Sequence, residues 1–232
     1  MTTAQSGAET PTRFELLNAQ NHGQLRLRFP RSTRLHFVQI VASEFAAAAA
    51  CCPILFTKDA TTGEFYAGAM LGFKAGECLL ESAADRGGFE PLNIQREGFF
   101  TAGEQIAIDP DHARFGTQGE PLFDEAQQPS AQLRQMQRVL GQLHDGIAKT
   151  NAFIRTLLDL KLIEAIEVSL NFDDGERITL QGLYTVSMDS LHGLGDAEAV
   201  ALFRRGDLQR IYAMHTSLGQ IAVLATKRNR ML

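Results

Sequence analysis

The chain has 232 residues, 44% of them hydrophobic and 21% charged, and its 22 Lys and Arg against 27 Asp and Glu give a formal charge of −5. This composition is too apolar for a wholly disordered chain, three cysteines cannot form a disulfide scaffold, and an acidic balance argues against nucleic acid as a partner. We expect no transmembrane segment, because no apolar run reaches the ~18 residues that span a bilayer. The first residues lack a signal-peptide pattern, and together with the expected buried free thiols this favours a cytoplasmic location.

Residues 1–12 are expected to be a disordered N-terminal lead. The rest, 13–232, is expected to form a single domain that can divide into two subdomains near residues 111–130, a stretch rich in Gly, Pro and Gln.

The first half of the chain predicts short strands. Arg34–Ala42 is typical of a buried strand, and Ser43 is expected to cap a helix over Glu44–Cys52 that Pro53 ends. The further predictions are a hairpin of 53–58 with 64–73, a short strand over Glu77–Glu81, and one or two strands within Asn93–Pro110 with turns or bulges at Gly98 and Gly103.

A long helix over Ala131–Leu160 is the strongest helical prediction. An apolar stripe with spacings of three and four marks one face, and its first members are Leu133, Met136, Leu140, Leu143 and Ile147. Gly141 and Gly146 each weaken a helix by about 1 kcal/mol relative to Ala, so we expect a bend or break near Gly146. The stripe has two interpretations, an internal core or an interface in an oligomer or with a partner.

The C-terminal third predicts a hairpin followed by helices. Strands at 162–172 and 176–186 flank Asp174-Gly175, which suits a two-residue type I′ turn. Asp196 is expected to cap a helix that ends at Arg205, and Asp207 a last helix over 208–227 whose basic end is solvated. Together these elements indicate an α+β fold, a mostly antiparallel sheet packed against a long central helix and C-terminal helices.

No motif for catalysis or a cofactor occurs. The sequence lacks phosphate-binding loops, a nucleophile elbow and zinc-ligand spacings, and Ser217 diverges from His215 on a helix. We therefore predict no catalytic residue and no cofactor.

Two weaker site hypotheses remain. Asp109, Asp111 and His112 offer ligands for a hard cation or an iron, although Asp and Pro in this stretch equally suit a turn. Arg96, with Glu97 and Asn93, is a candidate for binding an anionic ligand, because a half-buried Arg can hold a carboxylate or phosphate. An internal ion pair is the alternative.

Several segments, in order, resemble the SapC family of bacterial proteins over roughly residues 33–225. The matching segments are Ser43-Glu44-Phe45 with Pro53–Phe56, Gly68–Gly72 with Gly76-Glu77, Asn93–Phe100, Ile108-Asp109 with Leu122–Glu125, Leu162–Glu164 with Asp174-Gly175 and Gly182–Tyr184, and Gly206–Leu208 with Tyr212 and Ser217-Leu218. The sequence departs at Cys51-Cys52, where the family commonly has an aromatic residue, and it lacks a Trp.

The resemblance implies a role beside other proteins rather than a reaction. Family members often accompany TonB-dependent receptors, flavin-dependent halogenase-like enzymes and cupin-type oxygenases, and no catalytic residue carries over. The leading hypothesis is thus a non-catalytic cytoplasmic binding or accessory protein that engages a protein partner, a peptide or a small molecule. The alternatives are a metal-dependent, oxygenase-like modifying enzyme and a structural or surface-layer-associated protein.

Overall fold

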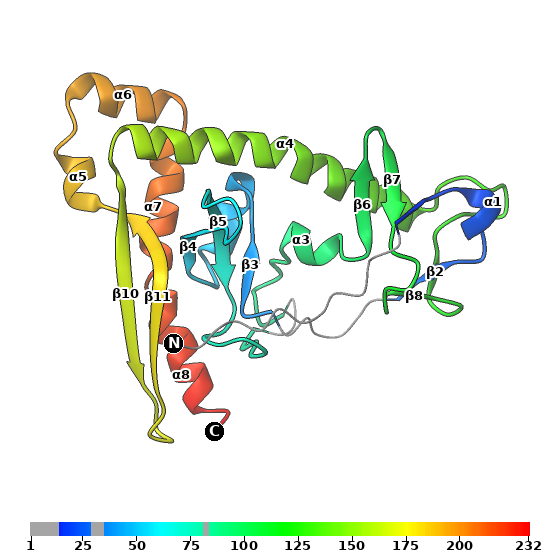
Figure 1. Cartoon of the computed structure of the whole chain (residues 1–232), viewed down its shortest axis with the longest axis horizontal. Helices are drawn as coiled ribbons and strands as arrows, with labels where there is room; N and C mark the ends of the chain where they lie inside the picture. Colours follow the sequence, from blue (N-terminus) through cyan, green and yellow to red (C-terminus); the bar gives the residue numbers. More distant parts are fainter. Residues whose placement is uncertain (1–13, 29–34, 81–83) are drawn as a thin grey trace. The chain divides into compact units, whose positions relative to one another are not determined.

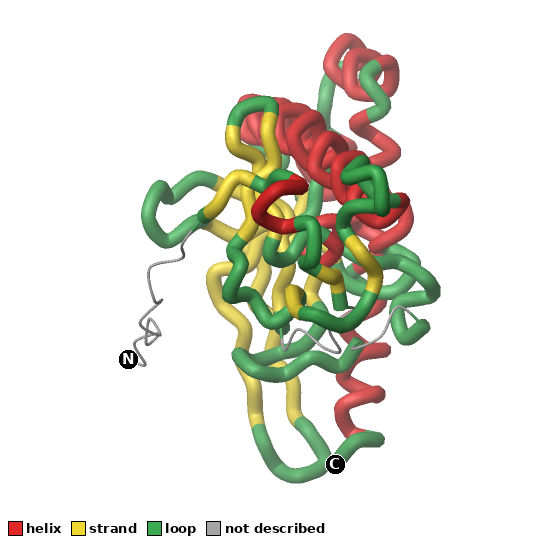
Figure 2. Tube along the Cα trace, turned by 90° about the vertical axis from the view of Figure 1, so that its right-hand side faces the viewer, coloured by secondary structure: helices red, strands yellow, loops and turns green. Residues whose placement is uncertain are grey.

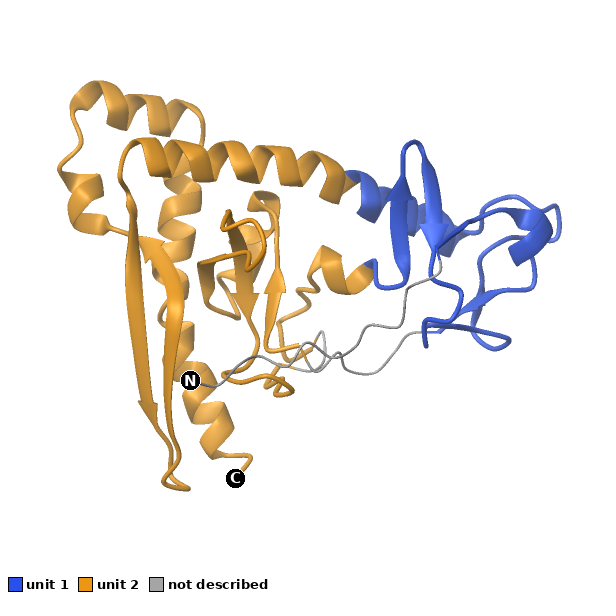
Figure 3. Ribbon diagram, in the orientation of Figure 1, with its two compact units in different colours: residues 1–30, 96–141 blue, residues 31–95, 142–232 orange. Residues whose placement is uncertain are grey.

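The computed structural model describes residues 14–28, 35–80 and 84–232 (Figure 1). The predicted N-terminal lead, 1–12, lies outside these residues. The chain divides into two compact units, a smaller one of residues 1–30 with 96–141 and a larger one of residues 31–95 with 142–232 (Figure 3). The segment 111–130 lies within the smaller unit, and the organisation as a single domain stays a prediction.

The smaller unit holds two three-stranded antiparallel sheets. One has the order β1-β7-β6 and the other β8-β2-β9. A short helix, α1 (Ala19–His22), begins at the capping side chain of Asn18. The strands are β1 (Glu15–Leu16), β2 (Arg26–Leu27), β6 (Phe99–Ala102), β7 (Gln105–Ile108), β8 (Phe115–Gly116) and β9 (Glu120–Pro121).

The predicted strands within Asn93–Pro110 are β6 and β7, joined by a tight turn in which Gly103 has a φ of 61°. Residues 93–95, however, belong to a short helix, α3 (Leu92–Gln95), in the larger unit. Leu92-Asn93-Ile94-Gln95 alternates apolar and polar residues as a strand does, but four residues are too few to distinguish a strand from a helical turn, so the strand interpretation was wrong for 93–95.

The larger unit is built on a five-stranded antiparallel sheet of order β10-β11-β4-β5-β3. Both predicted hairpins are present, as β4 with β5 and β10 with β11. The ladder between β11 and β4 has a single residue pair, Tyr184 with Phe56, and Thr57 Oγ1 of β4 also donates to the Gly182 carbonyl of β11 at 3.0 Å. The strands are β3 (Phe37–Gln39), β4 (Ile54–Lys58), β5 (Phe65–Met70), β10 (Ile163–Asn171) and β11 (Arg177–Val186).

Three strand predictions need correction. The strand expected over Arg34–Ala42 is only Phe37–Gln39, and no strand forms over 77–80, the described part of Glu77–Glu81. The tip of the second hairpin is a three-residue loop, since Phe172 pairs with Glu176 and Gly175 alone has a positive φ, 84°. A three-residue loop needs one left-handed residue, whereas a type I′ turn needs two.

Helices of the larger unit pack beside this sheet. Helices α7 and α8 run along one side of the strands (Figure 2), and Ser217 of α7, fully buried, accepts a hydrogen bond from the Ile54 amide at 2.8 Å. The rings of Phe45 and Phe56 lie 6.0 and 6.4 Å from that of Phe153 in the core. The helices are α2 (Phe45–Ala48), α5 (Met188–His192), α6 (Asp196–Arg204), α7 (Asp207–Ser217) and α8 (Gln220–Asn229).

Helix starts and ends differ from the predictions. A 3₁₀ turn, η1 (Ala42–Glu44), precedes α2, so Val41 rather than Ser43 is the N-cap, and the α-helix ends at Ala48. The single last helix expected over 208–227 is two helices, α7 and α8, that part at Leu218-Gly219. Gly195 and Gly206, not the following aspartates, are the N-caps of α6 and α7.

The basic end of α8 is only partly solvated, because Arg228 is buried although Arg230 is exposed. Arg228 is 4% exposed and its guanidinium carbon lies 4.0 Å from the centre of the Phe172 ring. Its Nε donates to Glu77 at 2.8 Å, and its Nη2 donates to Glu176, which Lys74 also contacts. The charge is therefore part of a partly buried network that joins α8 to the tip of the β10–β11 hairpin.

Helix α4 (Ala131–Asp159) matches the prediction in extent but not in shape, because it continues unbroken through Gly146. A Cβ at Gly146 would lie 2.7 Å from Cγ2 of Val41, whereas a Cβ at Gly141 would meet no atom within 4 Å. Gly146 thus allows the close approach of α4 to the turn before α2.

This contrast yields a paired prediction. Gly146→Ala should lower the free energy of unfolding by about 1–3 kcal/mol through overpacking against Val41. Gly141→Ala should raise it by up to about 1 kcal/mol through helix propensity. Urea unfolding of both variants measures the difference, and equal stabilisation by the two would contradict the close-packing role of Gly146.

Candidate functional site

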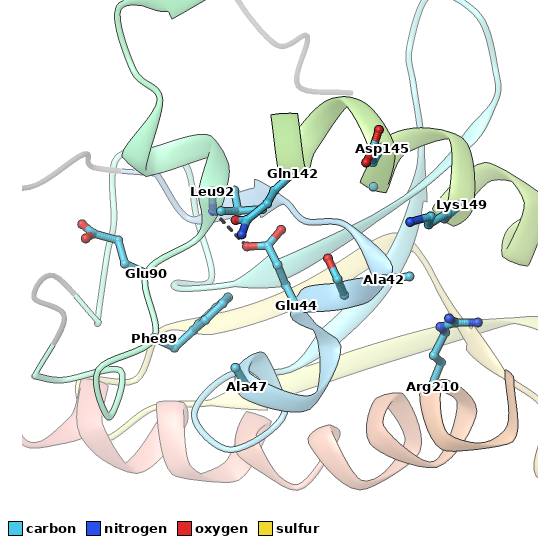
Figure 4. A pocket seen from close by; sticks show the side chains of 12 residues that line it. Ala42, Glu44, Ala47, Phe89, Glu90, Leu92, Gln142, Asp145, Lys149 and Arg210 are labelled. Atoms are coloured by element: carbon cyan, nitrogen blue, oxygen red, sulfur yellow. Dashed lines mark hydrogen bonds between the residues drawn. The ribbon is translucent and has the colours of Figure 1, made fainter. Parts of the chain in front are cut away.

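A pocket of about 590 Å³ opens in the larger unit where the Ala42–Glu44 turn, the Phe89–Leu92 segment and helices α4 and α7 meet (Figure 4). Its wall combines apolar groups with charged ones. The charged residues of the lining are Glu44, Glu90, Asp145, Lys149 and Arg210.

Glu44 is the buried charge of the pocket, with only 7% of its surface exposed. One carboxylate oxygen accepts a hydrogen bond from the amide of Val41 at 2.8 Å, and the other accepts one from the amide of Leu92 at 2.9 Å. Burial raises the pKa of this carboxyl, against the opposing effect of the two amides. Glu44 therefore ties two separate stretches of backbone together, and both of its oxygens are held in place by amides.

Helix α4 holds the same turn from the other side. Thr150 Oγ1 accepts a hydrogen bond from the Ala42 amide at 2.8 Å and donates one to the Gly146 carbonyl at 2.7 Å. Together with the contact of Gly146 and Val41, this bond fixes the turn against α4. The sequence breaks its apolar stripe at Thr150 because the side chain supplies this buried hydrogen bond, which would otherwise be missing.

Two cationic side chains, Arg210 and Lys149, line the pocket, and among the residues that the structure describes only Arg210 is held by an ion pair. The Nη1 of Arg210 contacts Asp207 at 2.6 Å, and this buried carboxylate also contacts Arg205 at 2.8 Å. In the described part of the chain, no hydrogen bond or ion pair engages the ammonium of Lys149, which is exposed on α4. Figure 4 shows Lys149 and Arg210 on the same side of the pocket. The arrangement can bind an anionic group with one fixed cation and one mobile cation.

The sequence-predicted anion site is distributed over the two units. Asn93, in the larger unit, donates from Nδ2 to the Gln39 carbonyl at 2.8 Å and holds α3 to β3. Arg96 and Glu97 belong to the smaller unit, in the turn before β6 rather than within a strand. The Arg96 guanidinium donates to the Phe99 carbonyl at 3.3 Å and lies 5.5 Å from the Phe100 ring centre, and burial lowers its pKa. A ligand site on these residues stays a prediction.

The predicted metal ligands form a turn. Asp109 Oδ1 accepts from the Asp111 amide at 3.1 Å, and His112 Nδ1 accepts from the Arg114 amide at 3.3 Å. Across residues 14–28, 35–80 and 84–232, no group of three or more His, Cys, Asp or Glu could hold a metal ion. The turn interpretation fits these contacts, and a metal site on these residues stays a prediction.

The apolar stripe of α4 is mostly buried within the chain. Leu133, Met136, Leu140 and Leu143 are 3 to 5% exposed, whereas Ile147 is 46% exposed. A role in an oligomer or partner interface stays a prediction, and Ile147 is the stripe residue that a partner could reach.

None of the three cysteines, all in the described residues, forms a disulfide, as expected, and Cys51 is less buried than Cys52 and Cys78. The Sγ atoms of Cys51 and Cys52 lie 3.8 Å apart. Neither residue lines the 590 Å³ pocket around Glu44, which we call the Glu44 pocket.

Sequence reasoning missed the Glu44 pocket. It placed Glu44 in the first turn of a helix, where a carboxylate suits the dipole, and gave no weight to Lys149 or Arg210. The one available signal was a Glu beside the end of an apolar strand. Three other residues of the pocket, Leu92, Lys149 and Arg210, are about 48, 105 and 166 positions away in sequence.

The raised pKa of Glu44 has a consequence for stability. The folded chain binds this proton more tightly than the unfolded chain, whose Glu pKa is about 4.3, so the stability of the wild type falls as the pH rises from that value through the raised pKa. Glu44→Gln removes the titration, so the stability of the variant relative to the wild type should increase from pH 4 to pH 7.

Urea unfolding across this pH range measures the effect. Glu167→Gln, which changes an exposed residue on the edge strand β10, is the control and should leave the pH dependence of the wild type unchanged. A difference between wild type and Glu44→Gln that stays constant from pH 4 to pH 7 would show that the Glu44 pKa is not raised.

Comparison with known proteins agrees with the resemblance seen in the sequence. Searches of curated proteins and of solved structures found no match. No helix in the described residues is long and apolar enough to cross a membrane. The SapC family model matches residues 17–224. The chain therefore belongs to the SapC family.

Proposed function

We propose that this protein is a non-catalytic binding protein whose Glu44 pocket takes the carboxylate end of a small molecule or peptide. The observation that carries the proposal is the pairing of a fixed cation, Arg210, with an unengaged cation, Lys149, in one concave site. A carboxylate between them would gain charge-assisted hydrogen bonds, which are stronger than neutral ones.

The role of Glu44 supports binding rather than catalysis. A general base must be free to reach a substrate proton, but each oxygen of this carboxyl accepts a backbone amide, and these two bonds hold the group in the pocket wall. The residue instead fixes the shape of the pocket. Such preorganisation lowers the entropic loss on binding.

The apolar part of the lining suits a ligand with a hydrophobic group next to its carboxylate. Phe89, Leu92 and Ala47 lie on the pocket wall, and Figure 4 shows the Phe89 ring beside the cavity. An aromatic amino acid or the C-terminal residue of a peptide has this combination of groups.

The cytoplasmic location and the accessory role beside a halogenase-like or oxygenase enzyme are part of the proposal. Their support is membership of the SapC family together with the absence of a recognisable catalytic motif in the sequence. A pull-down from the native cell that recovers no specific enzyme partner would count against the accessory role.

The pocket proposal is tested with a matched pair of probes, N-acetylphenylalanine and its amide, which differ in charge but hardly in shape. Calorimetry should show binding of the carboxylate and at least tenfold weaker binding of the amide. Lys149→Gln should weaken carboxylate binding at least tenfold, because a hydrogen bond to a charged group contributes about 1.5–3 kcal/mol.

Arg155→Gln removes a positive charge from the same helix outside the pocket and is the control for net charge. It should leave the affinity unchanged. Equal binding of acid and amide, or equal effects of the two substitutions, would overturn the proposal. A peptide that ends in phenylalanine and binds more tightly than the free acetylated residue would identify a chain end as the ligand.

A further inference from the structure

A second pocket, on the five-stranded sheet, has a different chemistry. It has a volume of about 480 Å³, within the range of small-molecule sites, roughly 300–1,000 Å³. Strands β3, β4, β5 and β11 and the segment after β5 contribute its lining. We call it the His36–Tyr66 pocket, and it shares no lining residue with the Glu44 pocket.

The strand register places the pocket on the sheet face opposite the core phenylalanines. Thr57 pairs with Tyr66, and Phe37 pairs with Met70. Side chains alternate between faces along a strand, so these four lie on the face opposite Phe56, whose ring is 6.4 Å from that of Phe153 of α4. This face of the sheet therefore carries aromatic and apolar groups that the helix α4 does not cover.

Gly68 makes room for an aromatic ring of the pocket wall. A Cβ at Gly68 would lie 2.1 Å from Cε1 of Phe37, so the Phe37 ring occupies the space of the missing side chain. The ring also lies 6.2 Å from that of Tyr66 in an edge-to-face arrangement. The result is a preformed aromatic wall, which Leu180 and Leu183 of β11 complete on the other side.

Two polar groups of the pocket, the His36 ring and the Tyr66 hydroxyl, are neutral and have unused hydrogen-bonding capacity. Among the residues described, neither the His36 ring nor the Tyr66 hydroxyl has a hydrogen-bond partner. Burial lowers the pKa of His36, against an opposing effect of Glu77, and raises the pKa of Tyr66. At pH 7 the pocket thus offers an uncharged imidazole and an uncharged phenol.

Charge separates this pocket from the other one. None of its lining residues is Asp, Glu, Lys or Arg, whereas five lining residues of the Glu44 pocket are charged. A charged ligand would lose its hydration here without an opposite charge in return, which is strongly unfavourable. A neutral ring would instead bury apolar area and satisfy the polar groups.

We propose that the His36–Tyr66 pocket binds an uncharged planar aromatic molecule, which packs against Phe37 and Leu183 and exchanges hydrogen bonds with His36 and Tyr66. This site goes beyond the carboxylate site proposed above. It gives the protein a second ligand of a different class.

The test uses benzamide and benzoate, which have nearly the same shape but differ in charge. Met70 lines the pocket, so the methyl resonance of Met70 in the full chain labelled with 13C-methyl methionine reports on binding there. Met136 and Met214 are buried and do not line the pocket, and they serve as internal references. Met70→Leu assigns the resonance.

Benzamide should shift the Met70 resonance saturably with a dissociation constant of about 1 mM, reasonable for so small a ligand, and should leave Met136 and Met214 in place. Benzoate should bind at least tenfold more weakly. No saturable shift of Met70, equal binding of the two probes, or equal shifts of all methionines would overturn the proposal.

A double variant, His36→Leu with Tyr66→Phe, removes the polar groups and should weaken benzamide binding at least fivefold. Tyr212→Phe is the matched control, because Tyr212 is 46% exposed on α7 and outside the pocket. An unchanged affinity of the folded double variant would overturn the assigned hydrogen bonds. The comparison of benzamide with benzoate on the unsubstituted protein stands independently of whether the variant folds.

Discussion

The larger unit depends on one buried carboxyl group. Glu44 joins the amide of Val41 to that of Leu92, two stretches separated by the β4–β5 hairpin, while Thr150 binds the next amide, that of Ala42, from α4. A buried amide without a partner is costly, at about 1–3 kcal/mol, so the three hydrogen bonds fix the positions of these elements. The same bonds shape the pocket in which Lys149 and Arg210 lie.

Local patterns predicted the elements that depend on local physics. The stripe from Leu133 onward predicted α4, and the alternation around Asp174-Gly175 predicted the β10–β11 hairpin. The errors occur where tertiary contacts decide. The low helix propensity of Gly146 suggested a break in α4, but the structure shows that the missing side chain lets Val41 pack closely against the helix. The charge of Arg228 suggested a solvated helix end, but its side chain is buried and donates hydrogen bonds to Glu77 and Glu176.

The candidate sites show the same division. Asp109, Asp111 and His112 are close in sequence, and the structure places them in one turn. The pockets instead combine residues from distant parts of the chain, such as Glu44 with Lys149 and Tyr66 with Leu183. One sequence without contacts cannot reveal such groupings. No sequence motif marks a Glu that holds the fold together, such as Glu44, or a His that stays neutral in a pocket, such as His36.

The single pairing of Tyr184 with Phe56 between β11 and β4 has a consequence for motion. Toward its turn, the β10–β11 hairpin has, within the described chain, no strand pairing with the rest of the sheet. The hydrogen bonds between β10 and β11 can therefore open there without breaking the central sheet. The network of Arg228, Lys74 and Glu176 retains the tip. Salt screens the exposed pair of Lys74 and Glu176 more than the buried Arg228. We therefore expect amide hydrogen exchange at the tip to become faster as ionic strength rises, while Arg228 still holds it.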